Sequence, residues 1–132
     1  MGVSVSIVIP VLNEAQALPR ILTAVEQLQQ GFETEIIVVD GGSTDATLDV
    51  AHRYPYRILG APRGRASQMN AGAALATGEV LLFLHGDTTL PLSACALIDA
   101  AVGGSSTVSE AHRGAEWGWF DVRIDSSKWA FR

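Results

Sequence analysis

The sequence has only one cysteine, Cys95, among its 132 residues. A single cysteine excludes an intrachain disulfide and any metal site built from several cysteines, so sulfur chemistry does not organise this fold. This composition fits a reducing compartment. We therefore expect a cytoplasmic protein, either free or peripheral to a membrane.

Long apolar runs and an excess of positive charge are also missing. The longest apolar run, residues 80–84, is far shorter than the roughly 20 residues that cross a bilayer, so we expect no transmembrane segment. The N-terminus has no basic segment and its apolar stretch ends at Pro10, which argues against a signal peptide. Nine basic residues against fourteen acidic ones give a net charge of −5, so we expect no nucleic-acid partner.

What the sequence does contain is a set of compact apolar segments, at residues 5–9, 35–39 and 80–84. They are rich in Val, Ile, Leu and Phe and do not alternate with polar residues, which is typical of parallel strands buried on both faces. A weaker segment, residues 56–60, is flanked by prolines and predicts a shorter strand nearer to an edge of the sheet.

Helical patterns separate these strands. The first has apolar residues at helical spacing from Leu18 to Leu28, with Pro19 in its first turn and Gly31 after its end. Further helices are predicted at residues 44–53, 64–76 and 91–102, and one more strand at residues 117–124.

The regular alternation of strands and helices predicts an α/β fold. We expect a doubly wound, mostly parallel sheet with helices on both faces, in a single domain covering residues 1–132. Ligands of such sheets bind outside the carboxyl ends of the strands, where the strand order reverses. The polar segments that follow the predicted strands are therefore the candidate site.

The segment after the second strand begins with Asp40 and continues through two glycines to Ser43. Gly42 allows the backbone to approach a ligand closely, and Ser43 or Thr44 can cap the next helix. The Asp40 carboxylate can accept a hydrogen bond from the N–H of a nucleotide base. Alternatively, Asp40 and Asp45 only cap the turn and the helix.

The segment after the first strand contains Pro10, Asn13 and Glu14. A functional Glu14 would accept a hydrogen bond from a ribose or sugar hydroxyl, while Pro10 would shape the loop beneath the base. A carboxylate is also favoured at the start of a helix by the helix dipole, so Glu14 has a structural explanation as well.

The third connection has Arg63 and Arg65 on either side of Gly64, and Asn70 on the helix that follows. Two guanidinium groups at a helix N-terminus predict a diphosphate site, because the dipole and the donors both favour anions. Two solvated arginines, and an Asn70 that points to water, are the ordinary alternatives.

The segment after the fourth strand contains His85 and Asp87. Asp87 follows a fully apolar strand closely, which predicts a carboxylate at the edge of the sheet. Oxygen ligands of this kind suit Mg²⁺ or Mn²⁺, which usually bind one or two carboxylates together with substrate phosphates. His85 can coordinate Mn²⁺, donate to a phosphate, orient Asp87, or serve only as a structural hydrogen-bonding group.

Together these segments resemble glycosyltransferase family 2, which has the GT-A fold, in the branch with a His-x-Asp motif in place of Asp-x-Asp. The resemblance covers residues 3–125. It rests on Ser6-Ile7-Val8-Ile9-Pro10, Asn13-Glu14, Val38-Val39-Asp40-Gly41-Gly42-Ser43-Thr44-Asp45, Arg63-Gly64-Arg65, Asn70-Ala71-Gly72 and Leu82-Phe83-Leu84-His85-Gly86-Asp87-Thr88.

The resemblance implies a transferase that takes a sugar from a nucleotide-diphospho sugar, UDP-sugar in preference to GDP-sugar, and transfers it with inversion to an acceptor hydroxyl. It places the nucleoside against Pro10, Glu14 and Asp40, and the diphosphate near Arg63 and Arg65. The resemblance further implies that Asp87, with His85 beside it, binds Mn²⁺ or Mg²⁺ and serves catalysis. Asn13, Gly42, Ser43 and Asn70 complete the predicted binding residues.

Members of this family continue well beyond the strand at residues 117–124, so we expect this chain to be the donor-binding part of a longer enzyme. An inactive nucleotide-binding module that lacks the catalytic base is the alternative. A nucleotidyltransferase or a dinucleotide-dependent dehydrogenase is disfavoured, because no glycine-rich phosphate loop follows the first strand.

Aromatic residues near the C-terminus predict a homodimer, with exchange of C-terminal segments as one form of it. They are Trp117, Trp119, Phe120, Trp129 and Phe131.

Overall fold

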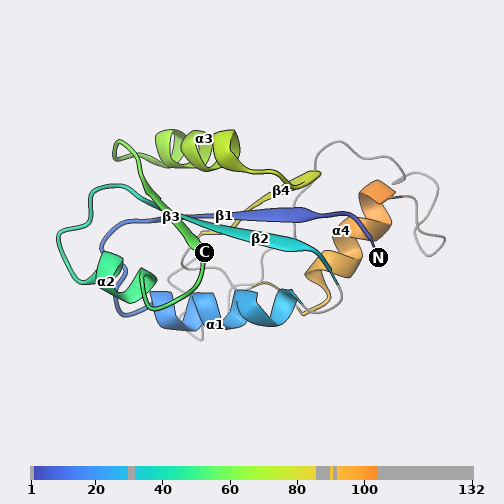
Figure 1. Cartoon of the computed structure of the whole chain (residues 1–132), viewed down its shortest axis with the longest axis horizontal. Helices are drawn as coiled ribbons and strands as arrows, with labels where there is room; N and C mark the ends of the chain where they lie inside the picture. The colour runs from blue at the N-terminus through green and yellow to red at the C-terminus, as the bar shows by residue number, and fades with distance from the viewer. Residues whose placement is uncertain (1, 30–31, 86–89, 91, 104–132) are drawn as a thin grey trace, which may run out of the picture.

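The computed structural model describes residues 2–29, 32–85, 90 and 92–103. In this part of the chain strands and helices alternate, as Figure 1 shows. The elements are β1 (Val5–Val11), α1 (Leu18–Leu28), β2 (Thr34–Asp40), α2 (Thr47–Ala51), β3 (Arg57–Gly60), α3 (Arg65–Leu75), β4 (Val80–Phe83) and α4 (Ala94–Gly103). The predicted strand at residues 117–124 and the C-terminal aromatic residues lie outside the described residues.

The described strands form one parallel sheet of four strands in the order β3-β2-β1-β4. From β1 the chain moves through β2 to β3 at one edge and then returns to the other side of β1 for β4. The strand order therefore reverses between β1 and β4. Parallel sheets of this kind bind their ligands at such a reversal, outside the carboxyl ends of the strands.

Helices cover both faces of the sheet, as predicted. In Figure 1, α3 lies on one side of the strands and α1 and α2 lie on the other. Successive residues of β1 serve the two faces because side chains alternate along a strand. Ile7 and Ile9 join the larger core with α1, whereas Val8 packs with Ile37 and Val39 on the α3 side.

The prediction that residues 80–84 are buried on both faces was wrong. The side chains of Leu81 and Phe83 are each 41% exposed. They are in register with Ser6 and Val8, on the face that α3 covers. Because α3 packs mainly over β1 and β2, it leaves this face of β4 open, and β4 is an edge strand among the described residues.

The helix boundaries differ modestly from the predicted ones. Pro19 lies in the first turn of α1, as predicted. The helix predicted at residues 44–53 is shorter, because Thr44 and Asp45 belong to the preceding loop and α2 begins only at Thr47. Within the part of the chain that is described, no helix is long and apolar enough to cross a membrane.

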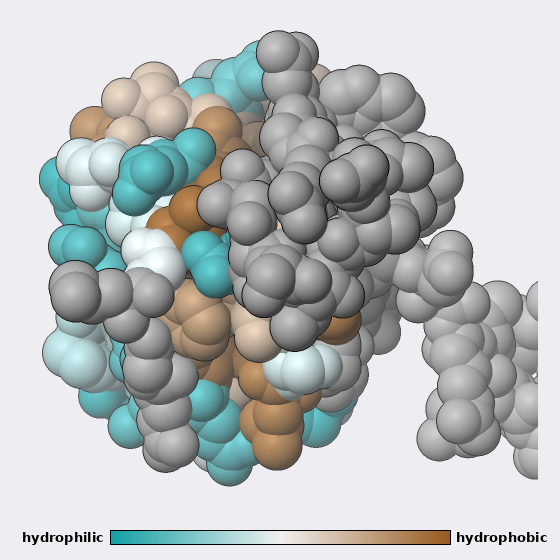
Figure 2. All heavy atoms as spheres, turned by 90° about the vertical axis from the view of Figure 1, so that its right-hand side faces the viewer, coloured by the Kyte–Doolittle hydropathy of each residue, from teal (hydrophilic) through white to brown (hydrophobic). Residues whose placement is uncertain are grey.

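Apolar surface is exposed at the end of the molecule where α4 lies. Figure 2 views this end and shows hydrophobic surface between hydrophilic residues. Leu92, just before α4, is 73% exposed, and Leu97, on α4, is 51% exposed.

Candidate functional site

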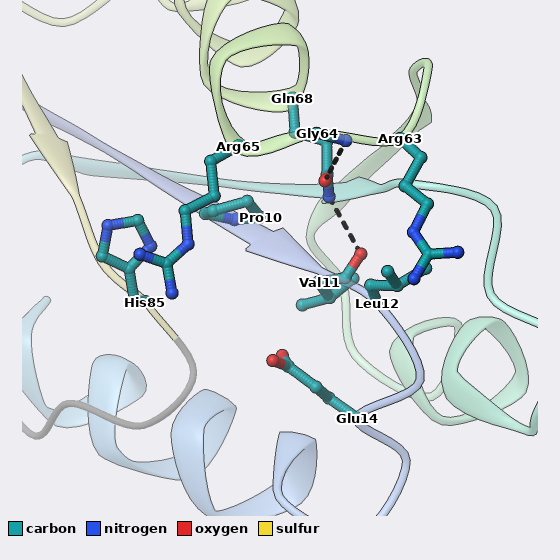
Figure 3. Close-up of a pocket in the computed structure, with 9 residues that line it drawn as sticks. All are labelled: Pro10, Val11, Leu12, Glu14, Arg63, Gly64, Arg65, Gln68 and His85. Atoms are coloured by element: carbon teal, nitrogen blue, oxygen red, sulfur yellow. Dashed lines mark hydrogen bonds between the residues drawn. The ribbon is translucent and has the colours of Figure 1, made fainter.

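A cavity of about 330 Å³ lies at the carboxyl end of β1, beside the point where the strand order reverses. Its walls come from the end of β1 and the following loop, from the start of α3, and from the end of β4 (Figure 3). The lining residues are Pro10, Val11, Leu12, Glu14, Arg63, Gly64, Arg65, Gln68 and His85. Five predicted site residues therefore share one cavity: Pro10, Glu14, Arg63, Arg65 and His85.

Two arginines extend into this cavity from either side of Gly64. In Figure 3 the Arg65 guanidinium reaches toward His85, while the Arg63 side chain descends beside Leu12. Gly64 has a φ of 136°, in the region that favours glycine, and it immediately precedes α3. Guanidinium groups beside a helix N-terminus favour an anion such as a diphosphate.

Glu14 faces the arginines across the cavity, with its carboxylate directed inward in Figure 3. Its backbone N–H donates to the Thr47 hydroxyl at 2.8 Å, and that hydroxyl donates to the Asp45 carboxylate. Hydrogen bonding from the Thr47 side chain lowers the pKa of Asp45 below its usual range. A charged Asp45 thus holds buried Thr47, which fixes the start of the Glu14 loop.

Asp40 is buried at the end of β2 and does not line the cavity. One carboxylate oxygen accepts the backbone N–H groups of Gly42 and Ser43, each at 3.0 Å, and the other accepts the Ser43 hydroxyl. Asp40 therefore caps the turn after β2, as the alternative interpretation of this residue predicts. Gly42 has a φ of 95°, so the turn itself requires glycine.

Asn13 also interacts with the chain instead of lining the cavity. Its side-chain oxygen accepts the backbone N–H of Thr44 at 2.8 Å, and its backbone N–H donates to the Ser43 hydroxyl at 2.9 Å. Asn13 and Ser43 therefore join the loops that follow β1 and β2. Asn70 is exposed on α3 and is absent from the cavity lining.

Gln68 is a cavity residue that was not predicted from the sequence. Its amide is 4% exposed and bonds to the ends of β1 and β2 and to Gly64. Its position one turn into α3 could have drawn attention to it, because a polar residue on the sheet-facing side of a helix needs buried partners.

Of the two predicted metal ligands, one lies among the described residues. The described part of the chain contains no group of three or more His, Cys, Asp and Glu side chains that could hold an ion. His85 lines the cavity and can supply one imidazole ligand. Asp87, the predicted carboxylate ligand and catalytic residue, lies outside the described residues.

Comparison with known sequences points to one family. Residues 6–100 match glycosyl transferase family 2. A PGL/p-HBAD biosynthesis glycosyltransferase of Mycobacterium bovis is 40% identical over 92 residues, which cover 64% of this chain and 36% of that protein. An uncharacterized glycosyltransferase of Mycobacterium tuberculosis is 31% identical over 123 residues, which cover 89% of this chain and 54% of that protein. The chain thus spans about one third to one half of the length of these relatives.

Solved structures give the same fold. Glucosyl-3-phosphoglycerate synthase from Mycobacterium tuberculosis, in complex with Mn²⁺, UDP and glucosyl-3-phosphoglycerate, has a TM-score of 0.59 at 26% identity and covers 64% of this chain and 34% of its own. A mannosyltransferase from Pyrobaculum calidifontis, in complex with GDP-Man and Mn²⁺, has a TM-score of 0.64 at 25% identity. The match covers 76% of this chain and 33% of that structure's chain. The family match extends over most of the chain, and the parallel α/β sheet agrees with these structures. The protein therefore belongs to glycosyltransferase family 2 and has the GT-A fold.

Proposed function

We propose that the cavity binds a nucleotide-diphospho sugar and that the protein transfers the sugar to an acceptor hydroxyl with inversion. The observation that carries this proposal is the pair of guanidinium groups, from Arg63 and Arg65, that enters one cavity opposite the Glu14 carboxylate. A diphosphate needs cationic donors, whereas ribose and sugar hydroxyls need acceptors, and the cavity presents both kinds of group.

We assign the proposed binding roles as follows, and the positions of the residues around the cavity support them. Arg63 and Arg65 would neutralise the diphosphate, and Glu14 would accept a hydrogen bond from a ribose or sugar hydroxyl. Pro10 would form the floor beneath the base. Asp40 would act mainly on the loop that it caps, and its contribution to base recognition would be a single additional hydrogen bond.

The base is proposed to be uracil in preference to guanine. Similar proteins have been solved with UDP in one case and with GDP-Man in another, so the family resemblance alone accommodates both. Tighter binding of UDP than of GDP is the expected result.

We include Mn²⁺ or Mg²⁺ in the proposal. His85 and Asp87 would hold the ion, an imidazole and a carboxylate being suitable ligands for Mn²⁺ when phosphate oxygens complete the shell. Such an ion neutralises the charge that develops on a leaving nucleoside diphosphate. The arginines bind the same diphosphate from the side of α3.

Calorimetry with UDP, GDP, UDP-glucose and GDP-mannose, each with and without Mn²⁺, tests the proposal. Asp87→Ala should weaken Mn²⁺-dependent nucleotide binding. The matched control is Asp49→Ala, which removes an exposed aspartate on α2 and should leave that binding unchanged. Failure of all four nucleotides to bind, or binding that is indifferent to Asp87→Ala, would refute it.

A nucleotide-binding module without transfer activity is the second candidate. It is favoured by one observation: among the described residues that line the cavity, Glu14 is the one carboxylate, and the proposal above assigns it to the donor. Release of UDP from a UDP-sugar, lost in Asp87→Ala and kept in Asp49→Ala, would exclude this candidate.

We also propose that the protein is a homodimer, with exchange of C-terminal segments as one form of it. Exposed Leu92 and Leu97 support an interface, since apolar surface of this kind favours association. Light scattering is expected to give twice the chain mass, and a monomer at micromolar concentration would contradict the proposal.

A further inference from the structure

Gln68 connects three segments that meet at the cavity. Its Nε2 donates to the backbone carbonyls of Val11 and Val39, both at 2.9 Å. Its Oε1 accepts the backbone N–H of Gly64 at 3.3 Å, and Figure 3 shows the bonds to Val11 and Gly64. One side chain therefore links the ends of β1 and β2 to the loop before α3.

The third of these bonds fixes the residue between the two arginines. Gly64 separates Arg63 from Arg65, so the direction of both guanidinium groups depends on how this residue is held. With a φ of 136°, its backbone is in a conformation that a free loop would leave easily. The bond from Gly64 to Gln68 opposes that motion.

The loop after β2 packs closely against the Gln68 amide and restricts its position. A Cβ added at Gly41 would lie 2.7 Å from the Gln68 Oε1 and 2.8 Å from its Cδ. The loop after β2 thus passes so close that only glycine leaves room for the amide. The amide is buried, and both its nitrogen and its oxygen have partners. Removing it takes a buried partner from the Val39 carbonyl and from the Gly64 N–H, whereas the Val11 carbonyl keeps the Gly41 N–H at 3.0 Å.

We propose that Gln68 is a positioning residue of the donor site, which sets the Arg63–Gly64–Arg65 segment at the distance from β1 that a diphosphate requires. This inference rests on the proposed function, since it assigns the two arginines to the diphosphate. Gln68 uses its polar atoms within the protein and acts on the ligand through the arginines.

Two substitutions at this position and one at Gly41 test the inference. Gln68→Met keeps the length of the side chain and removes every side-chain hydrogen bond, whereas Gln68→Glu keeps the acceptor for Gly64 and removes both donors. Both variants keep the backbone bond from the Gln68 N–H to the Gly64 carbonyl. Gly41→Ala leaves Gln68 intact but displaces its amide, and serves if the Gln68 variants fold poorly. Gln27→Met and Gln27→Glu, at an exposed position of α1, are the matched controls.

The first measurement needs no ligand. Hydrogen exchange of the Gly64 amide should accelerate about 10-fold or more in Gln68→Met, because the native bond is lost. In Gln68→Glu it should change less, because the acceptor remains. Exchange at Gly64 that is the same in Gln68→Met as in wild type would overturn the inference.

The second measurement separates positioning from general stability. Affinity for inorganic pyrophosphate and for UDP should fall about 10-fold in Gln68→Met, whereas affinity for uridine should stay within about 2-fold of wild type. An equal loss for uridine and UDP would indicate a merely structural role and would overturn the inference. If wild-type protein binds neither UDP nor pyrophosphate, the proposed function is overturned as well. If wild-type protein binds both and Gln68→Met binds them equally well, this inference alone is overturned.

Discussion

The Asn13 side-chain oxygen accepts the backbone N–H of Thr44 at 2.8 Å, and this bond joins the loop after β1 to the loop after β2. Asn13 has a φ of 51°, one of the left-handed conformations that asparagine tolerates better than most residues. The residue thus combines a backbone conformation with a side-chain bond.

Asn13→Gly and Asn13→Ala should separate these two contributions. Asn13→Gly loses only the side-chain bonds and should lower the free energy of unfolding by about 1 kcal/mol. Asn13→Ala loses the same bonds and also puts alanine, which tolerates the left-handed region less well than asparagine or glycine, at this position, so it should cost about 2 kcal/mol in total. Urea unfolding measures both, with exposed Gln16→Ala as the control. Equal losses for the two variants would contradict a conformational role for Asn13.

Arg63 and Arg65 should each contribute to diphosphate binding through charge-assisted hydrogen bonds. Removing one such bond costs about 1.5–3 kcal/mol, so Arg63→Ala and Arg65→Ala should each weaken pyrophosphate binding by about 10-fold or more. Lysine keeps the charge but not the planar fork of donors, so Arg65→Lys should fall between wild type and Arg65→Ala.

Titration calorimetry at low and high salt measures these affinities. Arg53→Ala, which removes an exposed arginine outside the cavity, is the control for the change in net charge. A loss in Arg53→Ala as large as in Arg65→Ala would show that pyrophosphate senses only the overall charge.

Much of the fold could be predicted from the sequence because its signals are local. The apolar strands, the helical spacing of α1 and the glycine at Gly42 each determine a short stretch of backbone. The exposed face of β4 could not be predicted in this way, since Leu81 is as apolar as a core residue. Its exposure depends on where α3 packs, which is a property of the assembled sheet.

The candidate site also contains residues that could be predicted from local sequence and residues that could not. Pro10 and the two arginines could be assigned to one cavity because parallel strands bring their carboxyl ends to one edge. Asn13 and Asp40 were predicted to contact the ligand. The structure gives the Asn13 side chain a partner in the neighbouring loop, and the Asp40 side chain partners in the loop that directly follows it. Gln68 was missed, because its partners are backbone carbonyls far away in sequence.

Acid should weaken the end of the sheet opposite the cavity through Glu35. A backbone hydrogen bond from Thr77, at 2.9 Å, is the main cause that lowers the pKa of Glu35 below its usual value of 4.5, and bonds from Ser6 and Arg57 add to it. A carboxyl whose pKa is lower in the folded state stabilises the fold above its unfolded pKa. That contribution is lost as the pH falls through the folded value.

Glu35→Gln should therefore have a lower free energy of unfolding than wild type. The difference should be constant between about pH 6 and pH 7 and should become progressively smaller below about pH 4.5. Urea unfolding across this range measures the difference. Glu33→Gln, which changes an exposed carboxylate nearby in the sequence, is the control. A difference that stays constant down to pH 3 would exclude the proposed protonation of Glu35.

Gly72 brings α3 against the sheet more closely than any other residue type would allow. A Cβ at this position would overlap Val8 Cγ1 and would lie 3.1 Å from Val39 Cγ2, both in the small core beneath α3. Gly72 is buried, and it lies one turn after Gln68 on the same side of the helix. The close approach of α3 therefore also sets how far Gln68 can reach.

Gly72→Ala should destabilise the protein although alanine is the better helix former. At an exposed helical position the same change would stabilise by about 1 kcal/mol, but here the overlap with Val8 should cost about 1–3 kcal/mol overall. Ala74→Gly, at an exposed position of α3, calibrates the propensity of this helix. Urea unfolding of both variants compares their free energies of unfolding. Gly72→Ala should also weaken pyrophosphate binding, because α3 carries Arg65. A variant more stable than wild type would show that α3 can move outward without loss, and that its close packing on β1 is dispensable.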